Sequence, residues 1–332
     1  MSEIICSNEY HIERIYNAPV GSVWQAWIDP VKTSEWWGPR GMSTTTLRKD
    51  VKTGGDWLFT MHGPDGKDYP NYVKFGEVVP GARLEYEHGA VADQPPMFRV
   101  VVSFSELNNK TKMNFRMIFS SSEEADEKRK FIRSVGGDST WDRLAEYLEL
   151  QNSGRDVFVI NRVFEIDIAR MYQVWTKPEH LMEWTAPAGF KGRYLSANIH
   201  AGGESFYEMT GNGLTMYGKA KYLELLEPDR LVYTQIFADR NGEVTRHPMA
   251  PTWPECLKTT VCLYGEAAMQ TRIELQWEVF GEATEQERAT FGAAKNGMAH
   301  GWTGSFDKLE AYLSVVFSTL SQNKASIATG MM

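Results

Sequence analysis

Alternation of apolar and polar positions along the chain predicts short β-strands. In residues 56–62 the large side chains Trp57, Phe59 and Met61 occupy every second position, and 98–104 and 113–119 alternate in the same way. One face of each segment is therefore bulky and apolar, and the other is mostly polar. This pattern is typical of an antiparallel sheet that is covered on one side.

A different period identifies helices. Apolar residues spaced at i, i+3, i+4 and i+7 predict an amphipathic helix near the start of the chain, with Val20, Val23, Trp24 and Trp27 on its buried stripe. Asp29-Pro30 then supplies an N-cap and a first-turn proline for a second short helix that ends near Trp36. Helical spacing returns over residues 131–150, which we predict to form one long helix.

The order of these elements predicts the fold class. A strand is followed by two short helices, several antiparallel strands and one long C-terminal helix. This order is typical of an α+β domain in which a curved antiparallel sheet wraps around the long helix.

The whole pattern occurs twice. Trp27 and Trp175, Trp36 and Trp184, and Pro39 and Pro187 are each separated by the same number of positions. A period of roughly 150 residues is far too long for a solenoid repeat and indicates a duplicated domain. We predict domains at 1–151 and 156–318, joined by a polar linker and followed by a flexible tail at 319–332.

The second copy is longer between its central strands. The extra residues fall in 239–258, a polar and proline-rich segment that contains His247 and Trp253. A functional interpretation places both side chains over a pocket of the second domain, because loops at the mouth of a scaffold often carry specificity. The alternative is an elongated surface hairpin.

Composition excludes several classes of protein. The 332 residues carry a formal net charge of −8 with no basic block, so neither nucleic acid nor an anionic membrane is expected as a partner. No apolar run is long enough to span a membrane, and the N-terminus does not resemble a secretory signal. The three cysteines, Cys6, Cys256 and Cys262, cannot form an even disulfide framework. We therefore expect a cytoplasmic protein.

Motifs for catalysis or metal binding are not evident in the sequence. None of the seven histidines lies at metal-ligand spacing from another, and neither GxSxG nor GxGxxG occurs. We predict no catalytic residue, no metal site and no cofactor.

Several segments of the two copies resemble those of a known family. They are "APVGSVWQAWIDPVKTSEWWGPRG" and "VVPGARLEY" in the first copy, and "DIARMYQVWTKPEHLMEWTAPAGF", "LLEPDRLVY" and "GWTGSFDKLEAYL" in the second. Together they resemble the SRPBCC or START-like helix-grip superfamily, and within it the group similar to the C-terminal domain of the activator of the heat-shock-protein-90 ATPase. The resemblance implies two tandem helix-grip domains and a link to the stress response. The first copy has Gly136-Gly137 where the second has Gly301-Trp302, which leaves open whether the two pockets are alike.

A helix-grip sheet that stands apart from its helix encloses an apolar cavity, where a ligand is expected. The inward positions are the candidates for its lining: Trp37, Trp57, Phe59, Met61, Phe115 and Met117 in the first copy, and Tyr207, Met209, His247, Trp253, Trp277, Met298 and Trp302 in the second. The alternative is that these side chains simply fill the core. Trp37 is singled out because its counterpart is Thr185.

Three functions follow from the resemblance. The first is a non-enzymatic binding protein for a small hydrophobic ligand or metabolite, and the second is a co-chaperone that acts on a chaperone ATPase. The third is a cyclase- or hydrolase-like enzyme, which predicts a buried ionisable residue with a shifted pKa inside a pocket. We expect a monomer in which the two domains pack together.

Overall fold

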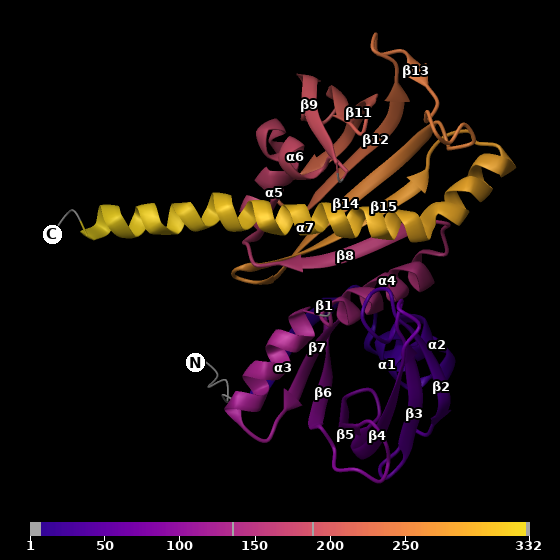
Figure 1. The fold of residues 1–332 in the computed structure, drawn as a ribbon, viewed down its shortest axis with the longest axis vertical. Helices are drawn as coiled ribbons and strands as arrows, with labels where there is room; N and C mark the ends of the chain where they lie inside the picture. Colours follow the sequence, from indigo (N-terminus) through magenta and orange to yellow (C-terminus); the bar gives the residue numbers. More distant parts are fainter. Residues whose placement is uncertain (1–7, 135, 188, 330–332) are drawn as a thin grey trace. The chain divides into compact units, whose positions relative to one another are not determined.

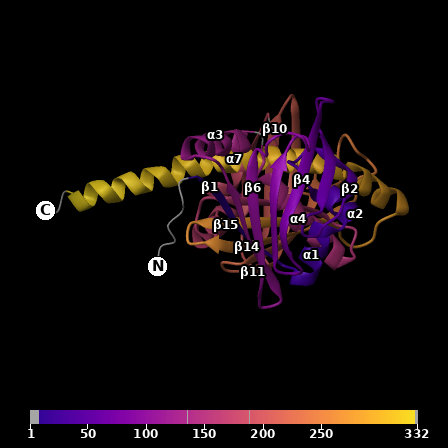
Figure 2. The same cartoon turned by 90° about the horizontal axis from the view of Figure 1, so that it is seen from below.

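The computed structural model describes residues 8–134, 136–187 and 189–329. The chain divides into two compact units, Met1–Gly154 and Arg155–Met332, called unit 1 and unit 2 below. Each unit contains one antiparallel sheet and several helices, so the predicted pair of α+β helix-grip domains is confirmed (Figures 1 and 2).

Unit 1 contains a seven-stranded sheet in the order β1-β7-β6-β5-β4-β3-β2. Its elements are β1 (Glu9–Tyr16), α1 (Val20–Ile28), α2 (Pro30–Trp36), β2 (Ser43–Lys49), β3 (Asp56–His62), β4 (Asp68–Val79), β5 (Arg83–Gly89), β6 (Phe98–Leu107), β7 (Lys110–Ile118), α3 (Ser122–Ser134) and α4 (Ser139–Ser153). The alternating segments at 56–62, 98–104 and 113–119 correspond to β3, β6 and β7. The strands pair antiparallel throughout this sheet, and β1 pairs with β7.

Short-range chemistry sets the two short helices of unit 1. The Asp29 carboxylate accepts hydrogen bonds from the backbone N–H groups of Val31 and Lys32 at 2.9 and 3.0 Å, which caps α2 as predicted. The Trp36 indole donates to the carbonyl of Ala26 at 3.1 Å, so it ties α2 back to α1. Both helices are thereby held against the end of the sheet.

The predicted single helix over 131–150 is wrong for unit 1. Two helices, α3 and α4, replace it, and Gly136 lies between them with a φ of +66°. This left-handed conformation ends a helix and favours glycine, because a side chain there would be strained. The backbone N–H of Gly137 then donates to the carbonyl of Ile132 at 2.7 Å, which closes the turn.

Unit 2 repeats the arrangement with an eight-stranded sheet in the order β8-β15-β14-β12-β11-β10-β9, and β13 pairs with β12. Its elements are β8 (Phe158–Phe164), α5 (Ile168–Thr176), α6 (Pro178–Trp184), β9 (Phe190–Ala197), β10 (Glu204–Gly211), β11 (Leu214–Leu226), β12 (Arg230–Ala238), β13 (Val244–Thr245), β14 (Cys256–Ala267), β15 (Gln270–Val279) and α7 (Glu285–Thr329).

The long helix α7 runs across the sheet of unit 2 (Figure 1). It continues as helix to Thr329, through most of the segment predicted to be a flexible tail at 319–332. Residues 330–332 of that predicted tail lie outside the described part of the chain.

A paired glycine positions the same strand in each unit. A Cβ on Gly55 would lie 2.1 Å from the carbonyl oxygen of Asp50, and one on Gly203 would lie 2.1 Å from that of Asn198. Neither position can hold a larger residue without moving the backbone. Because the same turn precedes both strands, β3 in unit 1 and β10 in unit 2 begin in the same way.

Candidate functional site

Unit 2 contains a cavity of about 400 Å³ between its sheet, α7 and the 239–258 insertion. This volume lies within the range typical of small-molecule sites. The lining is mostly aromatic and aliphatic, and it comes from β9 to β12, β15, α5, α6, α7 and the insertion. The walls therefore come from parts of unit 2 that are far apart in the sequence.

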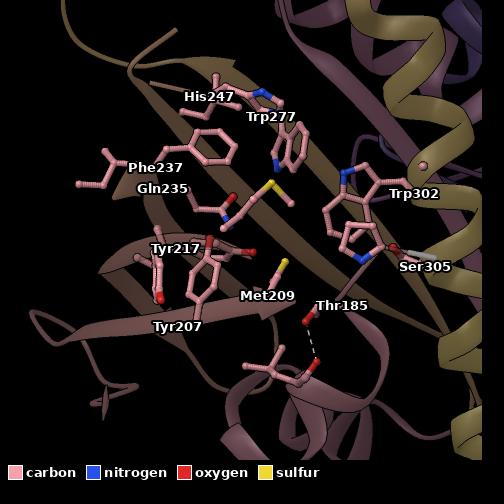
Figure 3. Close-up of a pocket in the computed structure, with 18 of the residues that line it drawn as sticks. Thr185, Tyr207, Met209, Tyr217, Gln235, Phe237, His247, Trp277, Trp302 and Ser305 are labelled. Atoms are coloured by element: carbon pink, nitrogen blue, oxygen red, sulfur yellow. Dashed lines mark hydrogen bonds between the residues drawn. The ribbon is translucent and has the colours of Figure 1, made fainter. Parts of the chain in front are cut away.

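All seven side chains predicted for the second pocket lie on the wall of this one cavity. They are Tyr207, Met209, His247, Trp253, Trp277, Met298 and Trp302. Trp277 on β15 and Trp302 on α7 approach each other from opposite walls, with ring centroids 5.5 Å apart (Figure 3).

The insertion covers the cavity because polar contacts attach it to the start of α7. The Arg246 guanidinium pairs with the carboxylate of Glu287 and also donates to the carbonyl of Trp253 at 3.3 Å. The hydroxyls of Thr252 and Thr290 are 3.0 Å apart. These contacts hold His247 and Trp253 over the cavity rather than on an extended surface hairpin.

His247 is a neutral member of the wall. Burial lowers its pKa below the usual value, since desolvation disfavours the charged imidazolium. Its Nδ1 accepts a hydrogen bond from the backbone N–H of Met249 at 3.1 Å, so the proton of the neutral ring is on Nε2. The ring packs against Phe237, with centroids 4.7 Å apart.

Four tyrosines on adjacent strands form the polar end of the cavity: Tyr194 on β9, Tyr207 on β10, Tyr222 on β11 and Tyr233 on β12. They lie in two cross-strand pairs, Tyr194 with Tyr207 and Tyr222 with Tyr233, whose ring centroids are 6.2 and 5.8 Å apart. The neighbouring strand accommodates the Tyr207 ring because Gly218 has no side chain; a Cβ there would lie 2.5 Å from the ring.

The tyrosine hydroxyls stay protonated. Burial raises the pKa of Tyr207 to about 12, and it raises the pKa values of Tyr194, Tyr222 and Tyr233 above the usual range as well. The buried ionisable group that an enzyme would need is thus present, but its shift is away from neutrality. These groups can donate hydrogen bonds, and at neutral pH they cannot take up a proton.

Sequence reasoning missed three of these tyrosines and Gln235. The signal was available, because Tyr222, Tyr233 and Gln235 lie on strands that alternate as Tyr207 does. Tyr233 also aligns with Tyr86 in the repeated "RLxY" motif, and both are buried or nearly so in their cores. The sequence therefore indicates which residues face inward, but it does not indicate which of them line the cavity.

The six side chains predicted to line a pocket in unit 1 lie in its hydrophobic core or pack against it. Trp37, Trp57, Phe59 and Phe115 are buried in the core, and Met61 and Met117 are half-buried against it. Trp57 stacks on Phe59 with centroids 3.9 Å apart, and Trp37 contacts Trp57 at 5.0 Å. A pocket at the surface of unit 1, lined by Val20, Trp24 and Tyr147 among others, includes none of the six, so for them the alternative interpretation, a filled core, fits the structure.

Two aligned positions that carry indoles in unit 1 carry hydroxyls in unit 2. Trp37 and Trp57 align with Thr185 and Ser205. Thr185 lines the cavity, and the Ser205 hydroxyl is 3.1 Å from that of Tyr222. The position of Trp37 in the core of unit 1 therefore corresponds to a position that borders the cavity of unit 2.

The fold and the cavity together define a tandem helix-grip protein with an internal pocket in its second domain. The family model described as "Activator of Hsp90 ATPase homolog 1-like protein" matches residues 17–149 and 165–314. Because these two matches cover most of the chain, the chain belongs to this family. None of the curated proteins compared with the chain matches it.

Solved structures resemble the chain at low sequence identity. A crystal structure of a protein from Nitrosomonas europaea is 22% identical and covers 45% of this chain and 99% of its own, with a TM-score of 0.42. One from Mycobacterium smegmatis is 23% identical, covers 42% and 89%, and has a TM-score of 0.38. The di-domain ARO/CYC BexL from the BE-7585A biosynthetic pathway is 11% identical, covers 92% and 98%, and has a TM-score of 0.38.

The described residues show no sign of a membrane span or of a metal centre. No helix there is long and apolar enough to cross a membrane. No group of three or more His, Cys, Asp or Glu side chains within 8–134, 136–187 and 189–329 is arranged to hold a metal ion.

Proposed function

We propose that this chain is a binding protein that holds a small hydrophobic ligand in the cavity of unit 2. The observation that carries the proposal is an aromatic-lined cavity of about 400 Å³. Each 100 Å² of apolar ligand surface moved from water into such a cavity contributes roughly 2.5 kcal/mol. A ligand of two or three fused or linked rings would therefore bind without any ion pair.

The insertion supports the same proposal. It is attached to α7 by Arg246 and places His247 and Trp253 on the wall of the cavity. A cover of this kind excludes water from an apolar ligand, which strengthens its retention. Unit 1 then acts as the filled counterpart, with its core closed by Trp37 and Trp57.

The test uses N-phenyl-1-naphthylamine, a neutral apolar probe whose fluorescence rises in apolar surroundings. We expect one probe bound per full-length chain, counted by native mass spectrometry. Thr185→Trp fills the cavity with the residue type found at the aligned position of unit 1, and Ala220→Phe fills it from β11. Either variant is expected to weaken binding tenfold or more.

Leu47→Trp is the matched control, because it adds an indole to an exposed position of unit 1. It is expected to leave probe affinity unchanged. The proposal fails if the wild-type chain does not bind the probe, or if both filling variants bind it as well as the control does.

A further inference from the structure

Two polar side chains on the cavity wall, Gln235 and Tyr207, lie close together (Figure 3). The Thr259 hydroxyl donates to Oε1 of Gln235 at 2.8 Å, which leaves the amide N–H₂ of Gln235 free to donate in turn. The Tyr207 hydroxyl points toward that amide (Figure 3). An amide N–H can only donate, so the Tyr207 oxygen is placed to accept from it and the Tyr207 O–H remains available for a ligand.

The charge of the cavity wall disfavours an anionic ligand. Glu255 is the one charged side chain among the described lining residues, and His247 is neutral. Arg246, close to the mouth, is already paired with Glu287 and with Glu255. An anion inside the cavity would lose its hydration without gaining a cation, which is strongly unfavourable.

We infer that the ligand is an uncharged molecule with an apolar body and at least one accepting oxygen, such as a ketone carbonyl, which binds at the Tyr207 hydroxyl. The cavity thereby selects against carboxylates of the same shape. This inference rests on the proposed function, since it assigns the chemistry of a ligand in the same cavity.

Three probes of nearly equal shape test the inference on the unmodified full-length chain. 2-Acetylnaphthalene has a carbonyl acceptor, 2-ethylnaphthalene lacks it, and 2-naphthoate is an anion at pH 7.5. Affinities are measured by isothermal titration calorimetry, with quenching of tryptophan fluorescence as a second readout. We expect 2-acetylnaphthalene to bind about fivefold more tightly than 2-ethylnaphthalene, as one neutral hydrogen bond allows. 2-Naphthoate should bind at least tenfold more weakly than 2-acetylnaphthalene.

Tyr207→Phe removes the proposed donor and keeps the ring. It should abolish the preference for 2-acetylnaphthalene over 2-ethylnaphthalene and leave the affinity for 2-ethylnaphthalene nearly unchanged. Tyr69→Phe is the matched control, because it removes a tyrosine hydroxyl from an exposed position of unit 1, outside the cavity. This control should keep the fivefold preference.

The outcomes separate the inference from the proposed function. If 2-ethylnaphthalene binds as tightly as 2-acetylnaphthalene, or 2-naphthoate binds best, the inference is overturned while a hydrophobic binding cavity stands. If the preference survives Tyr207→Phe, Tyr207 is not the donor and the assignment is overturned. If none of the three probes binds, the proposed function fails and the inference falls with it.

Discussion

Trp37 offers the sharpest test of why unit 1 has a filled core. The indole is 8% exposed and contacts five aromatic rings, at centroid distances from 5.0 Å for Trp57 to 6.3 Å for Trp141. Trp37→Thr reproduces the residue at the aligned position of unit 2. It removes most of a large buried ring and leaves a hydroxyl in apolar surroundings.

The expected cost is about 3–5 kcal/mol of unfolding free energy, the range measured when a large aromatic side chain is truncated in a core. Area gives a similar figure, because a buried tryptophan removes roughly 150–250 Å² from water at about 25 cal/mol per Å². Since about 1.4 kcal/mol corresponds to a factor of ten, this cost would accelerate exchange through unfolding by about two to three and a half orders of magnitude.

Hydrogen exchange of the full-length chain, followed by mass spectrometry of its peptides, measures this effect separately in each unit. Peptides from β3, β6 and β7 should lose protection. Val31→Thr is the control, because Val31 lies on the neighbouring helix α2 and is 72% exposed. Protection in unit 1 that is the same for Trp37→Thr and for the control would refute the account of Trp37 as a filling side chain.

Three further predictions concern pH, the insertion and a turn. Burial lowers the pKa of His88 to about 4, so between pH 4 and 6.5 the unfolded chain binds more protons than the folded chain. The contribution of His88 to the free energy of unfolding is therefore fully present above pH 6.5 and falls by roughly 3 kcal/mol towards pH 4. Urea unfolding should show this loss in the wild type and not in His88→Gln. Arg246→Ala releases the insertion from α7 and should speed amide exchange there about tenfold, whereas Arg240→Ala should not. Gly136 has a φ of +66°, so Gly136→Ala should lower the free energy of unfolding by about 1 kcal/mol. Gly21 lies in α1, where an added Cβ meets no atom within 4 Å, so Gly21→Ala should raise the free energy of unfolding by about the same amount, as measured by thermal unfolding. Equal effects of the two glycine changes would contradict the conformational argument.

The local elements were largely predictable from the sequence. The period of two identified β3, β6 and β7, and the i, i+3, i+4, i+7 spacing identified α1. Asp29-Pro30 marked the start of α2, because its capping chemistry is local. The constant offset between the copies indicated two domains with the same order of elements, and the family model matches both of them.

Helix ends were less predictable. Gly136-Gly137 stands where a helix was expected to continue, and the left-handed conformation of Gly136 divides it into α3 and α4. The aligned Gly301-Trp302 in unit 2 lies inside the continuous helix α7. Glycine tolerates both states, so the packing around it decides whether the helix ends.

The order of apolar and polar residues is enough to indicate which side chains face inward in each unit, because the pleat of a strand and the turn of a helix are properties of the backbone. Whether those side chains meet depends on how the sheet and the helices pack. Trp37 and Trp57 in unit 1 are in contact, whereas Thr185, the counterpart of Trp37 in unit 2, lines a cavity of about 400 Å³. Whether an inward stripe becomes a core or a binding site depends on the sum of side-chain volumes across the gap between sheet and helix, and that gap is set by residues distant in the sequence.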